Sequence, residues 1–149
     1  MGGNVKFKVA GNRKLTFKLM EKKKYNFEID HLGYLQDEEL VKFYSSATVF
    51  VWASHFEGLG VPPLEAMKSG TACVISDCLG IRDFSKNNYN SFVVPIKNPE
   101  ALAKATIKLL TNEKLRKKFE KNSIKTAEDW KWEKVADRML KLFEKELKD

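Results

Sequence analysis

Two short segments, residues 48–53 and 72–75, are continuously apolar and rich in β-branched side chains. This pattern is typical of strands that are buried on both faces. Helical stretches lie between and after them, and the last one, over residues 135–143, keeps apolar residues three or four positions apart. Strands of this kind that alternate with helices form a parallel sheet covered by helices. The sequence therefore predicts an α/β fold built on a doubly wound parallel sheet.

The remaining elements follow from local signals. Further strands are expected at 5–10, 25–32 and 92–94, and helices at 13–24, 37–46 and 62–68, from Pro99 onward, and through most of the C-terminal part. Prolines suit the first turn of a helix, so Pro62 and Pro63 predict a helix start, and Gly70 predicts its end. The helix that begins at Pro99 has a predicted apolar stripe of Ala101, Ala105, Ile107 and Leu109 or Leu110.

Charge and cysteine content limit the class of protein. The 149 residues carry a net charge of +7, of which the first 24 residues contribute eight basic side chains against one acidic one. We interpret these as solvated lysines and not as a nucleic-acid surface, with contact to an anionic membrane as the next alternative. No apolar run has the length of a membrane helix and the N-terminus does not resemble a signal peptide, so a cytoplasmic protein is expected. Cys73 and Cys78 read as small core residues, and no ligand spacing predicts a metal site.

The loop after the 48–53 strand is the best candidate for chemistry. Ligands of parallel α/β sheets bind beyond the carboxyl ends of the strands. Here Gly58 and Gly60 would let the backbone approach a ligand, and the loop enters a helix whose N-terminal amides suit a phosphate. Glu57 and Glu65 flank that point, and a carboxylate accepts hydrogen bonds from two vicinal hydroxyls, as in a sugar or ribose. The same residues also fit a plain turn followed by a surface acid.

Several motifs in order point to one family. The loop has Ser54, then Glu-Gly-Leu-Gly at 57–60, then Val-Pro-Pro, then Leu-Glu-Ala-Met at 64–67. The flanking matches are His-Leu-Gly-Tyr-Leu at 31–35 with Glu39, Leu40 and Tyr44, Ser76-Asp77 with Gly80 and Asn90, Asn-Pro-Glu-Ala-Leu-Ala at 98–103, and Trp132. This series, which covers about residues 5–145, resembles the C-terminal donor-binding domain of retaining glycosyltransferases with the GT-B fold, the group 1 family. A Rossmann-like sheet is implied.

The resemblance implies roles for the loop residues. Glu57 would be the catalytic residue, which binds hydroxyls of the donor sugar and stabilises charge at its anomeric carbon. Backbone amides of the loop would meet the sugar and diphosphate, and Glu65 would hold the ribose. The amides concerned belong to Gly58, Leu59, Gly60 and Val61. The turn at Tyr34 and Leu35 would meet the base. Members of the family generally use no divalent metal, and this chain has no Asp-x-Asp motif that would hold one. No cofactor is expected, and the nucleotide-diphosphate sugar is expected as the substrate.

The chain also departs from the family pattern. Leu79 replaces the first glycine of a Gly-Gly pair, Ser91 replaces the glycine of Asn-Gly, and Asp83 stands where a glutamate is usual. Residues 1–149 contain no counterpart of the family's acceptor-binding domain or of the first strand and helix of its donor domain. That missing element brings the basic residues that neutralise the diphosphate. Arg13 and Lys14 are candidates to replace them, but they are better interpreted as surface residues.

We therefore expect a donor-binding domain over 1–149 that is inactive in transfer without an acceptor domain. The alternatives are a non-catalytic assembly module that pairs with a separate acceptor-domain subunit through residues 5–24, and a basic binder at the membrane surface. The expected partners are the nucleotide-diphosphate sugar, the acceptor domain and a membrane surface, and no nucleic acid is expected.

Overall fold

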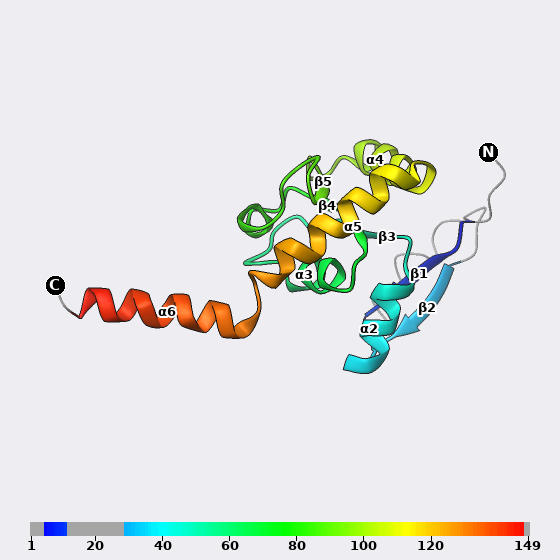
Figure 1. The fold of residues 1–149 in the computed structure, drawn as a ribbon. Helices are drawn as coiled ribbons and strands as arrows, with labels where there is room; N and C mark the ends of the chain where they lie inside the picture. Colours follow the sequence, from blue (N-terminus) through cyan, green and yellow to red (C-terminus); the bar gives the residue numbers. More distant parts are fainter. Residues whose placement is uncertain (1–4, 12–28, 148–149) are drawn as a thin grey trace. The chain divides into compact units, whose positions relative to one another are not determined.

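A computed structural model describes residues 5–11 and 29–147 of the chain. The chain divides into two compact units, residues 1–42 and 43–149. Figure 1 shows the elements of both units in chain order.

The first unit holds a two-stranded parallel ladder. Strand β1 (Phe7–Ala10) pairs with β2 (Ile29–Gly33), with Phe7 opposite Ile29. Helix α2 (Asp37–Ser46) begins in this unit, and the Glu39 carboxylate accepts a hydrogen bond of 3.0 Å from the Gln36 amide just before the helix. An acidic side chain at this position satisfies an amide that the helix itself leaves free.

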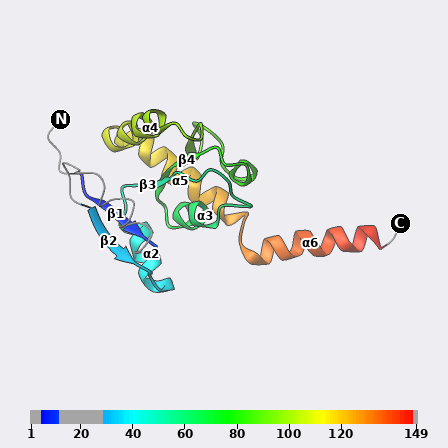
Figure 2. The ribbon, with the colours of Figure 1, turned by 180° about the vertical axis from the view of Figure 1, so that it is seen from behind.

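The second unit is built around a three-stranded parallel sheet. Its order is β3 (Val49–Trp52), β4 (Ala72–Ser76) and β5 (Ser91–Val94), so β4 is central and every residue of β4 is buried. Three helices contact β4: α3 (Val61–Lys68), α4 (Pro99–Thr111) and α5 (Glu113–Glu128). Figures 1 and 2 show α5 running alongside α3 and β4.

One face of the sheet carries a cluster of buried hydrophobic side chains. Its buried members are Ala72, Val74, Phe92, Val94, Leu109 and Phe119. The rings of Phe92 and Phe119 meet edge to face with centroids 5.0 Å apart, which joins β5 to α5. Side chains from β3 and α4, among them Val49 and Ala105, pack against this cluster.

The local signals in the sequence placed the helix ends correctly. Asn98 caps α4, since its side-chain oxygen accepts a hydrogen bond of 2.9 Å from the Ala101 amide. Helix α3 ends at Lys68, and Gly70 follows with φ 78°, a left-handed conformation that glycine adopts without steric cost. The α/β class and the parallel pairing are confirmed, and the described strands form two ladders. The helix predicted at 13–24 and the start of the strand predicted at 25–32 lie outside the described residues.

Two details of the predicted burial were wrong. Val51 in β3 is exposed, because among the described strands β3 has a neighbour, β4, on one side only. Ile107 is 51% exposed, whereas Ala101, Ala105 and Leu109 face the core. Ile107 lies two positions before Leu109, which turns its side chain about 200° around the helix and away from the sheet.

Helix α6 (Trp132–Glu146) has a regular apolar stripe that none of the described residues bury. The helix itself was expected, and its first residue, Trp132, is 82% exposed. Met139, Leu140 and Phe143 on the same stripe are exposed as well. None of the described helices is both long enough and apolar enough to span a bilayer.

Asn90 connects the segment before β5 to helix α5. It is fully buried, and its amide nitrogen donates to the Phe84 carbonyl at 2.8 Å and to the Thr126 hydroxyl at 2.9 Å. Its side-chain oxygen accepts from the Lys86 amide at 2.8 Å, and the Ser123 hydroxyl donates to its carbonyl at 2.8 Å. A side chain with this many buried partners is costly to remove, because each partner would lose its hydrogen bond without gaining water.

We expect Asn90→Ala to lower the free energy of unfolding by about 2–3 kcal/mol, since it leaves buried polar groups unsatisfied. Urea unfolding of the two proteins measures this difference. Asn87→Ala is the matched control: the Asn87 side chain accepts one exposed hydrogen bond from the Val93 amide, so a much smaller loss is expected. Equal losses in the two variants would contradict this account of Asn90.

Candidate functional site

The loop after β3 lies against the segment after β4. The Glu57 amide donates to the Cys78 carbonyl at 3.1 Å, and the Gly80 amide donates to the Glu57 carbonyl at 3.2 Å. At the end of β4, the Ser76 hydroxyl donates a hydrogen bond to the carbonyls of Trp52 and Ser54. The carboxyl ends of two neighbouring parallel strands are therefore tied together where ligands of such sheets bind.

Glycine is required where these two segments meet. A Cβ atom on Gly80 would lie 2.3 Å from the Gly58 carbonyl oxygen, and one on Gly60 would lie 2.9 Å from the Ile81 side chain. Gly60 also has φ 86°, the left-handed conformation from which α3 starts. A Cβ on Gly58, by contrast, would meet nothing within 4 Å. Gly80 and Gly60 allow close packing, whereas Gly58 leaves one side of the loop open.

Leu79 has a backbone conformation that side chains rarely adopt. Its φ is 67° and its ψ is −79°, and the amide of Gly80 donates to the carbonyl of Cys78 at 3.0 Å. These features define a γ-turn centred on Leu79, a strained conformation for any residue except glycine. The family pattern that the sequence resembles has a glycine at this position.

The amides between Glu57 and Glu65 make few contacts with the protein. Within the described ranges, the N–H groups of Gly58, Leu59, Gly60 and Val61 donate to no protein acceptor. Pro62 and Pro63, the next residues of α3, carry no N–H at all. The helix start therefore offers fewer donors than a usual helix, and the donors for an anion must come mainly from the loop.

Glu65 lies in the second turn of α3 and is partly buried. Its carboxylate oxygen Oε2 accepts a hydrogen bond of 2.9 Å from the hydroxyl of Tyr44, at the end of α2. Burial, followed by the hydrogen bond to Glu65, raises the pKa of Tyr44, so this hydroxyl stays a donor. Tyr44 belongs to one of the sequence motifs, but no local pattern predicts this contact between residues 21 positions apart.

Charges near the loop are already partly compensated. Arg82 pairs with Asp77 through two hydrogen bonds of 2.7 and 2.8 Å, and these hold the pKa of Asp77 below its usual range. Burial and then the charge of Glu57 raise the pKa of the Cys78 thiol, so Cys78 is a protonated core residue as predicted. Arg82 is thus not a free cation for a diphosphate. Arg13 and Lys14 lie outside the described residues.

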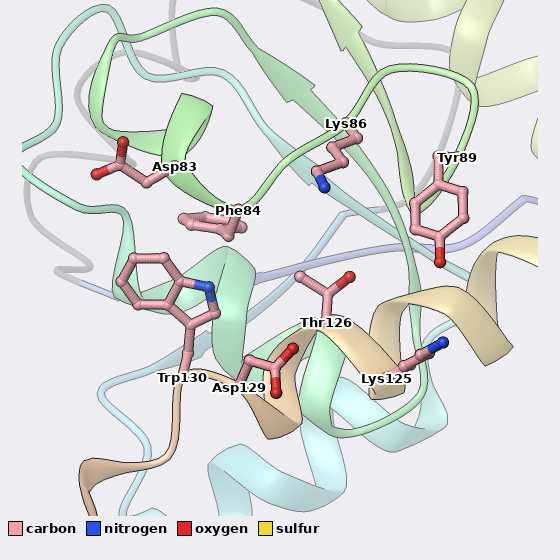
Figure 3. A pocket seen from close by; sticks show the side chains of 8 residues that line it. All are labelled: Asp83, Phe84, Lys86, Tyr89, Lys125, Thr126, Asp129 and Trp130. Atoms are coloured by element: carbon pink, nitrogen blue, oxygen red, sulfur yellow. The ribbon is translucent and has the colours of Figure 1, made fainter. Parts of the chain in front are cut away.

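Tyr34, Leu35 and a surface pocket lie outside the loop between Glu57 and Glu65. Tyr34 and Leu35 follow β2 in the first unit, where Tyr34 is exposed, and their role stays a prediction. An open pocket of about 290 Å³ lies between the segment after 83 and the end of α5 in the second unit. Figure 3 shows Phe84, Thr126 and Trp130 among its lining side chains. None of the predicted site residues lines this pocket. No group of three or more potential metal ligands occurs in residues 5–11 and 29–147.

Comparison with known proteins decides the family. The profile of the family "Glycosyl transferases group 1" matches residues 1–126. The chain is a member of this glycosyltransferase family. A relative from Campylobacter jejuni, N,N'-diacetylbacillosaminyl-diphospho-undecaprenol alpha-1,3-N-acetylgalactosaminyltransferase, is 33% identical over 121 residues, which make up 81% of this chain and 32% of the relative.

Solved structures of glycosyltransferases share the fold. A sucrose-phosphate synthase from Thermosynechococcus elongatus superposes with a TM-score of 0.82 at 22% identity, over 97% of this chain and 39% of that one. TarM of S. aureus has a TM-score of 0.80 at 26% identity, over 93% of this chain and 29% of that one. The group 1 domain described here thus spans about a third of the length of the Campylobacter relative and of these structures. Its Rossmann-like fold is that of the GT-B glycosyltransferases.

We expect Gly80→Ala to lower the free energy of unfolding by about 2–3 kcal/mol, because the new methyl group would overlap the Gly58 carbonyl and separate the two segments. Urea unfolding gives the difference. Gly58→Ala is the control, with a change expected within about 0.5 kcal/mol because its Cβ is unobstructed. An equal loss of stability in the two variants would show that the segments around Gly58 and Gly80 can move apart without cost.

At position 79 we expect a glycine substitution to give a more stable protein than an alanine substitution. Leu79→Gly and Leu79→Ala both remove the side chain, but only glycine relieves the γ-turn, so the glycine variant should be more stable by about 1 kcal/mol. In an ordinary loop conformation the order reverses, because glycine loses more chain entropy on folding. Thermal or urea unfolding distinguishes the two orders, and a more stable alanine variant would argue against the turn.

Proposed function

We propose that this chain is the donor-binding part of a retaining glycosyltransferase and holds a nucleotide-diphosphate sugar at the loop between Glu57 and Glu65. One observation carries the proposal: two carboxylates flank a run of loop amides without protein acceptors, at the carboxyl end of β3. Amides suit the oxygens of a diphosphate, and carboxylates suit the hydroxyls on either side of it.

Each end of the loop has its own role in this proposal. Glu57 binds hydroxyls of the donor sugar and, as the catalytic residue, stabilises the positive charge that develops at the anomeric carbon during transfer. Glu65 binds the ribose. The amides of the intervening residues, Gly58, Leu59, Gly60 and Val61, meet the diphosphate without a divalent metal.

Relatives support the choice of ligand. TarM, which is 26% identical, has a structure in complex with alpha-GlcNAc-glycerol and UDP. The pneumococcal O-GlcNAc transferase GtfA, whose likeness at 22% identity concerns the fold, has one in complex with UDP and GlcNAc. We therefore place uridine nucleotides first among the candidate donors and keep guanosine and adenosine nucleotides in the test.

Transfer needs a second part that binds the acceptor. The chain covers about a third of its relatives' length, and the apolar stripe of α6 is left uncovered by the described residues. We propose that the remainder of the enzyme, on the same or a separate polypeptide, covers this stripe. An exposed stripe that includes Trp132, Met139 and Phe143 is typical of such a contact. The 149 residues alone should then bind donor without transferring sugar.

The alternative of a basic surface binder has less support. The basic residues 6–24 lie largely outside the described ranges, and the described site contains loop amides and carboxylates that such a binder would not need. A cytoplasmic protein with peripheral membrane contact stays a prediction, and vesicles with anionic lipid provide its test.

A calorimetric titration with UDP, GDP and ADP tests the proposed function. We expect one nucleotide to bind, and Glu65→Ala to weaken it at least tenfold, because a hydrogen-bonded charge contributes about 1.5–3 kcal/mol. Glu57→Ala should leave the affinity for the free diphosphate nearly unchanged while lowering the affinity for its sugar conjugate.

Glu144→Ala, an exposed acid on α6, is the matched control for loss of one negative charge and should change neither affinity. Absence of binding for every nucleotide at millimolar concentration would contradict a donor site in this chain. Equal weakening by Glu144→Ala and Glu65→Ala would show a general effect of charge and not a specific contact.

A further inference from the structure

The hydrogen bond between Tyr44 and Glu65 joins two helices at the proposed ribose site. The hydroxyl of Tyr44 lies 2.9 Å from Oε2 of Glu65. In the described part of the chain, the other carboxylate oxygen, Oε1, has no hydrogen-bond partner. One oxygen of the carboxylate is thus fixed by the protein while the other is left available.

The position of Tyr44 is itself fixed on several sides. Its side chain is only 5% exposed, and its ring meets Phe50 of β3 edge to face, with centroids 5.4 Å apart and an interplanar angle of 81°. Its carbonyl accepts a hydrogen bond of 2.6 Å from the buried hydroxyl of Thr71, just before β4. Tyr44 is therefore held at a defined place relative to β3 and the start of β4.

Glu65 is held from the other side by its helix. Its carbonyl accepts hydrogen bonds of 2.9 Å from both the amide and the hydroxyl of Ser69, at the end of α3. The backbone of Glu65 is thus fixed, but its side chain can still rotate. Ordering this long side chain costs conformational entropy. A hydrogen bond to Oε2 restricts that rotation before any ligand arrives.

We propose that Tyr44 is a positioning residue: its hydroxyl holds the Glu65 carboxylate in the orientation that accepts hydrogen bonds from the two vicinal hydroxyls of the donor's ribose. This inference rests on the proposed function, because it assigns the ribose to Glu65. Sites that recognise a ligand well have their contacting side chains ordered in advance by such neighbours. The substrate class follows from the same chemistry, and ribonucleotides are preferred over 2′-deoxyribonucleotides.

The test is a comparison of Tyr44→Phe with the unchanged chain in calorimetric titrations. The substitution keeps the ring and its packing on Phe50 and removes only the hydroxyl. The ligands are UDP, GDP and ADP together with their 2′-deoxy counterparts. We expect Tyr44→Phe to weaken the ribonucleotide that binds by about tenfold and to weaken its 2′-deoxy counterpart distinctly less, because that ligand lacks one of the oriented hydroxyls.

Tyr89→Phe is the matched control, since Tyr89 is an exposed tyrosine of the pocket in Figure 3 and should leave both affinities unchanged. Thermal unfolding of each variant without ligand measures stability separately. A lower melting temperature with unchanged affinity would overturn the proposal and give Tyr44 a structural role only.

The remaining outcomes are distinct. Equal weakening of ribonucleotide and deoxynucleotide by Tyr44→Phe would overturn the positioning role while leaving the donor site intact. No binding of any nucleotide to the unchanged chain would overturn the proposed function and, with it, the role of Tyr44. Binding that Glu65→Ala abolishes but Tyr44→Phe leaves unchanged would retain Glu65 as the ribose contact and remove Tyr44 from the site.

Discussion

The contact of Gly80 with the backbone of Glu57 and Gly58 determines the shape of the candidate site. It brings the loop after β3 and the turn after β4 within hydrogen-bond distance, with the Gly80 amide 3.2 Å from the Glu57 carbonyl. A side chain at Gly80 would not fit. The loop is thereby fixed beyond the carboxyl end of β3, with the backbone of Glu57 bonded on both sides to the turn after β4.

The rest of the second unit supports this contact. The fully buried strand β4 fixes where the turn at Leu79 begins, and α3, α4 and α5 all pack against that strand. On the far side of the turn, Asn90 ties the chain back to α5 through buried hydrogen bonds. The γ-turn at Leu79 is thus held between two rigid anchors, which is where strained backbone conformations persist in folded proteins.

Family membership and site geometry answer different questions. The match to the group 1 glycosyltransferases gives the fold and the reaction class of the relatives. It does not describe how each side chain is ordered in this chain. That is seen in the Tyr44–Glu65 hydrogen bond, in the paired Arg82 and Asp77, and in the two prolines that remove amides from the start of α3. Because the two prolines lack N–H groups, the loop offers more backbone hydrogen-bond donors than the start of α3 does.

The sequence by itself determined the α/β class, the helix caps at Asn98 and Gly70, and the loop with Glu57 and Glu65, because these depend on local propensity and on spacing over a few residues. It placed Ile107 on the wrong face of α4, since several apolar residues compete for one stripe. Only the tertiary structure decided that Tyr44 meets Glu65 and that Gly80 meets Gly58. These partners lie about 20 positions apart, and the pairing of parallel strands brings them together, which no local pattern encodes.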